Sequence, residues 1–113
     1  MRKGEIWQIN LDPTIGAEIR KTRQAVIISE DAISILPLRV VVPLTDWKER
    51  YSVAPWMISI TPDIQNGLAK PSAADAFQIR SISQDRFVQR IGSLSEDKIK
   101  YILKAIQIVI GAT

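Results

Sequence analysis

Apolar and polar residues alternate along much of the chain with the two-residue period of β-strands. Residues 6–11 show the clearest alternation, and this segment ends at Asp12-Pro13. Residues 61–72, which contain proline and glycine, predict a connection. Apolar or β-branched runs predict further short strands at residues 24–28, 39–44, 53–60, 76–79 and 87–91. Together these strands predict a barrel or a strongly bent sheet.

The C-terminal part of the chain has a helical period instead. Ser95 can cap this helix, and Glu96 and Asp97 are favourable in its first turn, at the positive end of the helix dipole. The apolar residues on one face are Ile99, Ile102, Leu103, Ile106 and Ile110. No repeat, linker or low-complexity segment divides the chain. We therefore predict a mainly β fold with a C-terminal amphipathic α-helix, in a single domain over residues 1–113.

The composition limits the chemistry that the chain can perform. Its 113 residues include no cysteine and no histidine, which removes disulfides, the commonest zinc ligands and the usual neutral-pH acid or base. Any catalysis must use carboxylates, arginine, lysine, tyrosine or hydroxyl groups, so we expect no metal and no cofactor. No apolar run approaches the roughly 20 residues that span a membrane, so we expect a cytoplasmic protein. The net charge of +3 permits a polyanionic partner without identifying one.

Two charged loops carry the candidate chemistry, because binding groups concentrate on loops of a rigid β scaffold. Arg23 follows the first loop and Thr45 begins the second, so the two converge if their strands are neighbours. An arginine fork and a threonine hydroxyl suit the oxygens of a phosphodiester, and a carboxylate such as Glu18 can take a proton. These charges are equally typical of solvated loops. Trp47 can be a base-stacking platform or a rim residue, whereas Trp7, within a strand, is expected in the core.

Four segments in a fixed order extend this interpretation over nearly the whole chain. They are residues 12–18 together with 23–29, residues 42–45, residues 73–82 and residues 90–94. In this order they resemble the MazF/PemK family of ribonuclease toxins. The resemblance implies an SH3-like barrel of the CcdB/PemK kind with a C-terminal helix, in agreement with the hydrophobic pattern.

The resemblance also implies an activity. Members of the family are homodimers that cut single-stranded RNA at short sequences, as toxin components of type II toxin–antitoxin systems. The family's catalytic arginine falls on Arg23, its hydroxyl residue on Thr45 and its loop acid on Glu18. The RNA's own 2′-hydroxyl would act as nucleophile, which needs no metal and leaves a 2′,3′-cyclic phosphate and a 5′-hydroxyl. The implied partner is an antitoxin with a disordered acidic-hydrophobic tail.

We expect an RNA groove beside Arg23, Thr45 and Glu18. The sequence departs from the family pattern at two positions. The chain has Ala17 where many members have serine, which removes a hydroxyl, and Gln24 where they have proline, which removes a fixed φ. Neither change deletes a catalytic group. The residues expected to contact RNA are Arg20, Lys21, Trp47, Lys48, Arg50, Gln78 and Arg80.

Two other functions remain compatible with a small barrel that has basic loops. One is a non-catalytic RNA-binding module, which would bind the same substrate without turnover. The other is a gyrase poison of the CcdB kind, whose members resemble one another in a C-terminal Trp-Gly-Ile. This chain ends in Gly111-Ala112-Thr113, which argues against the gyrase interpretation.

Overall fold

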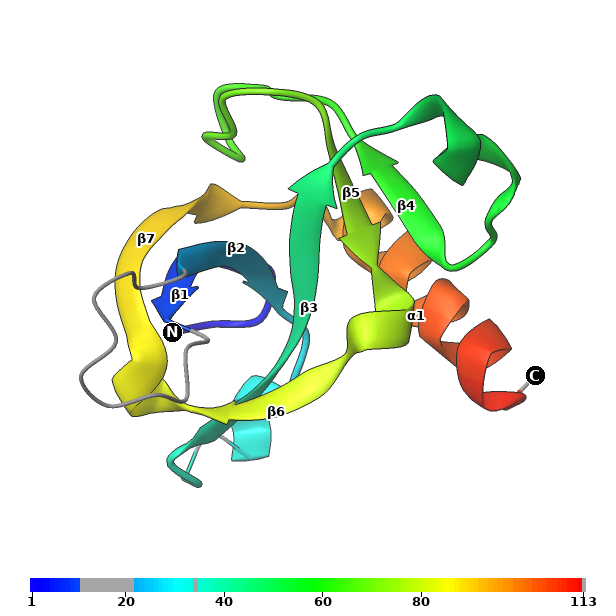
Figure 1. The fold of residues 1–113 in the computed structure, drawn as a ribbon. Coiled ribbons are helices and arrows are strands. Elements are labelled where there is room, and N and C mark those ends of the chain that lie inside the picture. Colours follow the sequence, from blue (N-terminus) through cyan, green and yellow to red (C-terminus); the bar gives the residue numbers. More distant parts are fainter. Residues whose placement is uncertain (11–21, 34, 113) are drawn as a thin grey trace.

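The computed structural model describes residues 1–10, 22–33 and 35–112. This part of the chain forms a bent antiparallel sheet with one α-helix, α1 (Glu96–Ile110), against one end (Figure 1). Short 3-10 helices interrupt the connections, among them η2 (Glu49–Val53) and η3 (Ala76–Gln78). The strands are β1 (Glu5–Asn10), β2 (Thr22–Ile27), β3 (Leu38–Asp46), β4 (Met57–Ile60), β5 (Ser72–Asp75), β6 (Arg80–Ser83) and β7 (Phe87–Ser93).

The long strand β3 joins two parts of the sheet. The strand order is β4-β5-β3-β2-β1-β7, and β6 also pairs with β3. Residues 41–43 of β3 pair with β2, whereas residues 44–46 pair with β5. Figure 1 shows the consequence: β1, β2, β6 and β7 curl round one half of the molecule, and β4 and β5 continue toward α1 in the other half. The expected mainly β, strongly bent sheet with a C-terminal helix is confirmed.

Two apolar clusters fill the space inside the sheet. The first lies between the sheet and α1 and includes Ile6, Val26 and Ile102, all fully buried. The second includes Ile9 and Val41, and Trp7 packs against it with its ring edge-to-face to that of Phe87. Trp7 therefore belongs to the core, as its strand position predicted.

The connection between β5 and β6 corrects one predicted strand. Leu44 of β3 pairs with Ala74, and Val41, three residues earlier, pairs with Arg80, six residues after Ala74. Three residues are therefore extra, and they form η3. The Asp75 carboxylate accepts a hydrogen bond from the backbone N–H of Phe77 at 3.1 Å and so caps this turn. The expected strand at residues 76–79 is wrong, because the turn replaces it.

Proline explains why the strand breaks at this point. The backbone N–H of Ile28 donates to the carbonyl of Val40, so the backbone groups of Val40 face β2. Backbone groups alternate in direction along a strand, which turns those of Pro43 toward β5 and β6. Proline has no N–H and offers the neighbouring chain only its carbonyl, so one ladder bond is lost here instead of two when that chain leaves β3 beside Pro43.

Other boundaries also differ from the sequence-based expectation. Of the expected strand at residues 53–60, only Met57–Ile60 is a strand, because residues 49–53 form η2. The expected connection at residues 61–72 ends where β5 begins at Ser72, and β6 was not predicted.

The helix begins as its sequence predicts. The Ser95 hydroxyl accepts a hydrogen bond from the N–H of Lys98 at 3.3 Å, and Gly111 ends the helix with φ of 70°, a left-handed conformation that glycine adopts readily. Ile102 is buried on the predicted apolar face, but Ile110 is 66% exposed, because the helix extends past the sheet at that end. No helix in the described ranges is long and apolar enough to cross a membrane.

Candidate active site

Arg23 and Thr45 lie where the two parts of the sheet separate. The ladder between β2 and β3 ends at the pair Ala25 and Pro43, and extending it by two residues sets Arg23 opposite Thr45. Side chains alternate between faces along a strand, so Arg23 lies on the same face as the buried Ala25, and Thr45 on the same face as the buried Val41. The face that carries the second apolar cluster thus becomes polar at the start of β2 and the end of β3.

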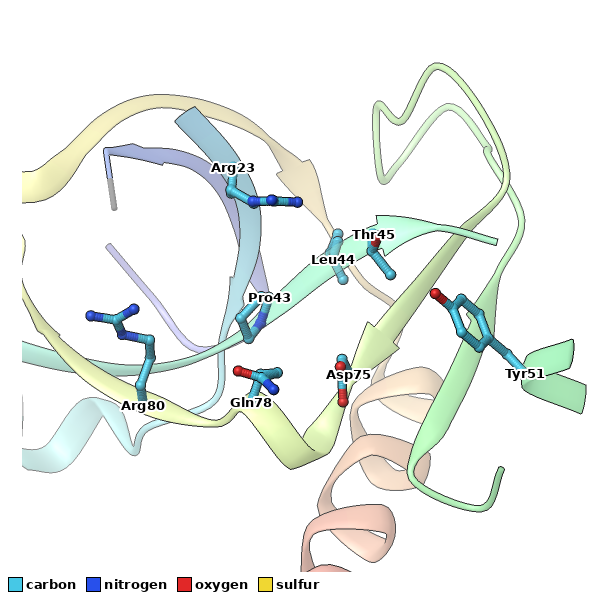
Figure 2. A pocket seen from close by; sticks show the side chains of 8 residues that line it. All are labelled: Arg23, Pro43, Leu44, Thr45, Tyr51, Asp75, Gln78 and Arg80. Atoms are coloured by element: carbon cyan, nitrogen blue, oxygen red, sulfur yellow. The ribbon is translucent and has the colours of Figure 1, made fainter. Parts of the chain in front are cut away.

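A cavity of about 320 Å³ opens beside this pair. Figure 2 shows the Arg23 side chain extended over β3 toward Thr45, and Tyr51 entering from the opposite side with its hydroxyl directed into the space. The lining residues are Arg23, Pro43, Leu44, Thr45, Tyr51, Asp75, Gln78 and Arg80. Two arginines, two hydroxyl groups, a carboxylate and an amide therefore converge on one space.

Arg23 is available to a ligand. Its side chain is exposed, and within the described part of the chain it has no hydrogen-bond or ion-pair partner. A guanidinium in this state presents its fork of N–H donors to the cavity, which is the geometry that suits phosphate oxygens.

The turn η3 builds the floor of the cavity. The three extra residues displace the chain from β3, so Asp75 before the turn and Gln78 within it both line the cavity. Arg80 begins β6 opposite Val41, which places it on the same face as Arg23. One Asp75 oxygen is occupied in capping the turn, as described above.

Tyr51 is a cavity residue that the sequence analysis missed. Its ring makes an edge-to-face contact with Trp47, with 5.9 Å between ring centroids, and the Arg50 guanidinium lies 5.3 Å from its ring centroid. The available signal was an aromatic residue directly after the charged loop that ends at Arg50. Trp47 and Arg50 thus contact Tyr51 and do not line this cavity, and their predicted contact with RNA stays a prediction.

The remaining predicted residues divide into three groups. Gln78 and Arg80 line the cavity, whereas Lys48 is exposed at the start of η2 and is absent from its lining. Glu18, Arg20 and Lys21 lie outside the described residues, and so does Ala17. The structure therefore brings Arg23 and Thr45 together and leaves the position of the predicted acid open.

A second cavity of about 300 Å³ shares Arg23, Leu44 and Thr45 with the first. It lies in the wedge between the diverging strands, and its further lining residues are Gln8, Thr22, Gln24, Asp46 and Lys70. Asp46 and Lys70 form an exposed ion pair, 3.1 Å between Oδ2 and Nζ. The two cavities meet at Arg23 and Thr45, so an extended ligand can pass this pair on both sides.

The described residues contain no cluster of three or more histidine, cysteine, aspartate or glutamate side chains that could hold a metal ion. The cavities instead offer cationic, hydroxyl and amide groups. This set can bind an anionic, hydrogen-bonding chain and can stabilise negative charge that develops on it.

Comparison with known proteins gives one consistent result. Residues 2–110 match the family model described as PemK-like, MazF-like toxin of type II toxin-antitoxin system. Endoribonuclease MazF9 of Mycobacterium tuberculosis is 33% identical over 114 residues, covering 96% of this chain and 94% of the relative. Endoribonuclease MazF of Staphylococcus saprophyticus is 28% identical over 111 residues, covering 98% of this chain and 92% of the relative.

Solved structures have the same fold. A mycobacterial endoribonuclease in complex with its cognate antitoxin superposes with a TM-score of 0.78 at 17% identity, covering 100% of this chain and 97% of that one. A MazE-MazF structure from Deinococcus radiodurans gives a TM-score of 0.80 at 18% identity, with the same coverage.

Proposed function

The chain belongs to the PemK-like, MazF-like toxin family of type II toxin–antitoxin systems, and we propose that it is a sequence-specific, metal-independent endoribonuclease that cuts single-stranded mRNA. The observation that carries the proposal is the convergence of Arg23 and Thr45 on a groove with space on both sides. Single-stranded RNA suits this groove, because its bases are free to leave the stack and enter pockets beside the backbone.

The reaction uses the RNA's own 2′-hydroxyl as the nucleophile. Its oxygen attacks the adjacent phosphorus while its proton passes to a carboxylate, for which Glu18 is our candidate. The bond from phosphorus to the 5′-oxygen then breaks, that oxygen takes a proton from solvent water to leave as a 5′-hydroxyl, and the carboxylic acid returns its proton to solvent. The other product carries a 2′,3′-cyclic phosphate.

Arg23 and Thr45 stabilise the charge that accumulates during this step. The Arg23 guanidinium donates to the phosphate oxygens and polarises the leaving 5′-oxygen, and the Thr45 hydroxyl donates to another phosphate oxygen. Both groups stand on paired strands, so little reorganisation is needed when the charge develops. Histidine, the usual shuttle for such protons, is absent from the chain.

A cleavage assay tests the proposal directly. The purified protein is incubated in excess EDTA with a long RNA and with an all-DNA copy of the same sequence. We expect cuts at a few short sites in the RNA and none in the DNA. Cleavage that requires added magnesium would contradict the mechanism, and binding without any cut would favour a non-catalytic RNA-binding module.

A single deoxy substitution tests the nucleophile. Replacing the nucleotide on the 5′ side of the cut by its 2′-deoxy form removes only the attacking oxygen, so cutting should stop while binding stays nearly unchanged. Persistent cutting would identify water as the nucleophile.

The same proposal includes the partners of the chain. An antitoxin with a disordered, acidic-hydrophobic tail would cover the cationic groove and exclude RNA, which is consistent with the antitoxin complexes of the similar structures. We infer a homodimer in the cytoplasm, where mRNA is found. Apolar groups left on the surface support association: Phe77 is 61% exposed and pairs edge-to-face with Trp56. A monomeric mass at micromolar concentration in light scattering would contradict the dimer.

A further inference from the structure

Three glutamines form a row across neighbouring strands beside the active site. Gln8 of β1 pairs directly with Gln24 of β2 on one side and with Gln89 of β7 on the other. Directly paired residues in antiparallel strands point their side chains to the same face of the sheet. The three amides therefore lie side by side on one face.

This face is apolar further into the molecule. Two residues from Gln8 and Gln24 along their strands, Ile6 and Val26 are fully buried in the first core cluster and pair with each other. At the glutamine row this cover ends: Gln8 and Gln24 are half-buried, and Gln89 is exposed. Among the described residues, none of the three side-chain amides has a hydrogen-bond partner.

The position of two of these amides distinguishes them from amides on an ordinary solvent-exposed face. Gln8 and Gln24 line the second cavity, which shares Arg23 and Thr45 with the first. An RNA whose scissile phosphate lies at Arg23 and Thr45 continues past them in both directions. The nucleotide next to that phosphate therefore lies within the wedge that these amides line.

An amide side chain is better suited to binding a base than a phosphate. A glutamine side chain presents one acceptor oxygen and two donor hydrogens and carries no charge. The amide oxygen and one amide N–H together match an adjacent donor and acceptor on a base edge. Proteins read base edges by such bidentate contacts from glutamine and asparagine. Lysine and arginine are the usual groups for phosphate, and in this cavity Lys70 and Arg23 provide them.

We propose that Gln8 and Gln24 form a base-reading subsite for the nucleotide next to the scissile phosphate, and that Gln89 extends it toward the following nucleotide. The proposal rests on the proposed ribonuclease function and adds to it a determinant of the cleaved sequence. Gln24 occupies the position directly after the catalytic arginine, so the same strand end delivers both the charge and the base contact.

Replacement by methionine tests the subsite, because methionine has a similar length but cannot make the amide hydrogen bonds. The substitutions are Gln24→Met and Gln8→Met, with Gln107→Met as the control, since Gln107 is an exposed glutamine on α1 that lines neither cavity. Each protein cuts a randomised RNA pool in EDTA, and sequencing of the products gives the base preference at every position around the cut.

We expect the preference at one position adjacent to the cut to fall roughly tenfold in Gln24→Met and Gln8→Met, in line with one lost bidentate contact. The other positions and the control should keep the wild-type profile. An unchanged profile in both variants would overturn the subsite, as would an equal loss of cutting at all sequences. A wild-type protein that cuts nothing would instead refute the ribonuclease proposal itself.

A double-mutant cycle that combines a protein variant with a modified RNA keeps the test informative if a variant folds poorly. The preferred base is replaced by an abasic nucleotide, and cutting by the wild type should fall by a similar factor. Gln24→Met should then lose nothing further on the abasic RNA, because the contact is already absent. An additive loss would show that Gln24 acts elsewhere and would contradict the proposal.

Discussion

Removing the Arg23 side chain separates catalysis from folding. The guanidinium reaches the cavity from the start of β2, where it can bind the phosphate oxygens on which charge develops. Loss of one donor of this kind typically costs about 3 kcal/mol of transition-state stabilisation, or roughly 10²-fold in rate. We therefore expect Arg23→Ala to cut at about a hundredth of the wild-type rate or less.

Stability should hardly change in the same variant. The Arg23 side chain is exposed and has no hydrogen-bond or ion-pair partner within the described ranges, so no buried group is left unpaired. Surface substitutions of this type usually fall within about 0.5 kcal/mol, which corresponds to a shift in Tm of no more than a few degrees.

Arg39 provides the opposite control. Its side chain is only 9% exposed, and its Nη1 donates to the carbonyls of Leu36 at 2.9 Å and Leu38 at 2.8 Å. Each hydrogen bond from a charged donor contributes about 1.5–3 kcal/mol. Two such bonds contribute about 3–6 kcal/mol, and a small domain loses about 4–8 °C per kcal/mol, so Arg39→Ala should lower Tm by about 12 °C or more.

Single-turnover cleavage of a short RNA in EDTA, at a temperature well below both melting transitions, measures the chemical step for the two variants. Arg23→Ala should have a lower cleavage rate and an unchanged Tm, whereas Arg39→Ala should have a lower Tm and an unchanged cleavage rate. Full activity in Arg23→Ala would show that the catalytic group has been misassigned. A collapsed Tm in that variant would make Arg23 a structural residue and refute the reasoning.

Three further predictions concern the acid, the sheet and pH. Glu18→Gln should slow cutting by about 10²-fold as loss of a general base, whereas Asp75→Asn, which can still cap its turn, should stay within about threefold in single-turnover assays. Gly92→Ala should destabilise by about 1–3 kcal/mol in urea unfolding, because its new Cβ would overlap the Asn66 carbonyl; an unchanged midpoint would disprove this contact. Burial raises the pKa of Glu5, but hydrogen bonds from the Trp7 ring and the Arg2 backbone outweigh it and hold that pKa below 4.5. Its contribution is therefore present above about pH 4.5 and is lost as the pH falls further, so Glu5→Gln and wild type should converge in stability at acid pH.

The elements that the sequence predicted well are those fixed by local chemistry. The helix from Ser95 to Gly111 combines a cap, acidic first-turn residues and an apolar face, all within its own residues. The alternation in β1 is likewise visible without knowledge of its neighbours. These signals need no information from distant parts of the chain.

The elements that were missed depend on pairing between distant segments. Residues 76–79 are apolar enough for a strand, but the offset between the β5 and β6 registers on β3 makes them a turn. In the candidate site, by contrast, Arg23 and Thr45 could be identified from the charged loops and the family resemblance. The glutamine row could not, because Gln8, Gln24 and Gln89 become neighbours only through the strand register.

The turn η3 gives the fold a place where its length can vary at little cost. Because Pro43 has no N–H to donate and the β5 and β6 ladders end on either side of it, residues can be added to or removed from this turn without shifting the β3 ladder on either side. Such a change would redraw the cavity floor, where Gln78 lies, and leave Arg23 and Thr45 in place on their strands. The fold thus keeps Arg23 and Thr45 on paired strands and the floor of their cavity on a turn, so a change of loop length alone, by design or by evolution, can reshape the cavity.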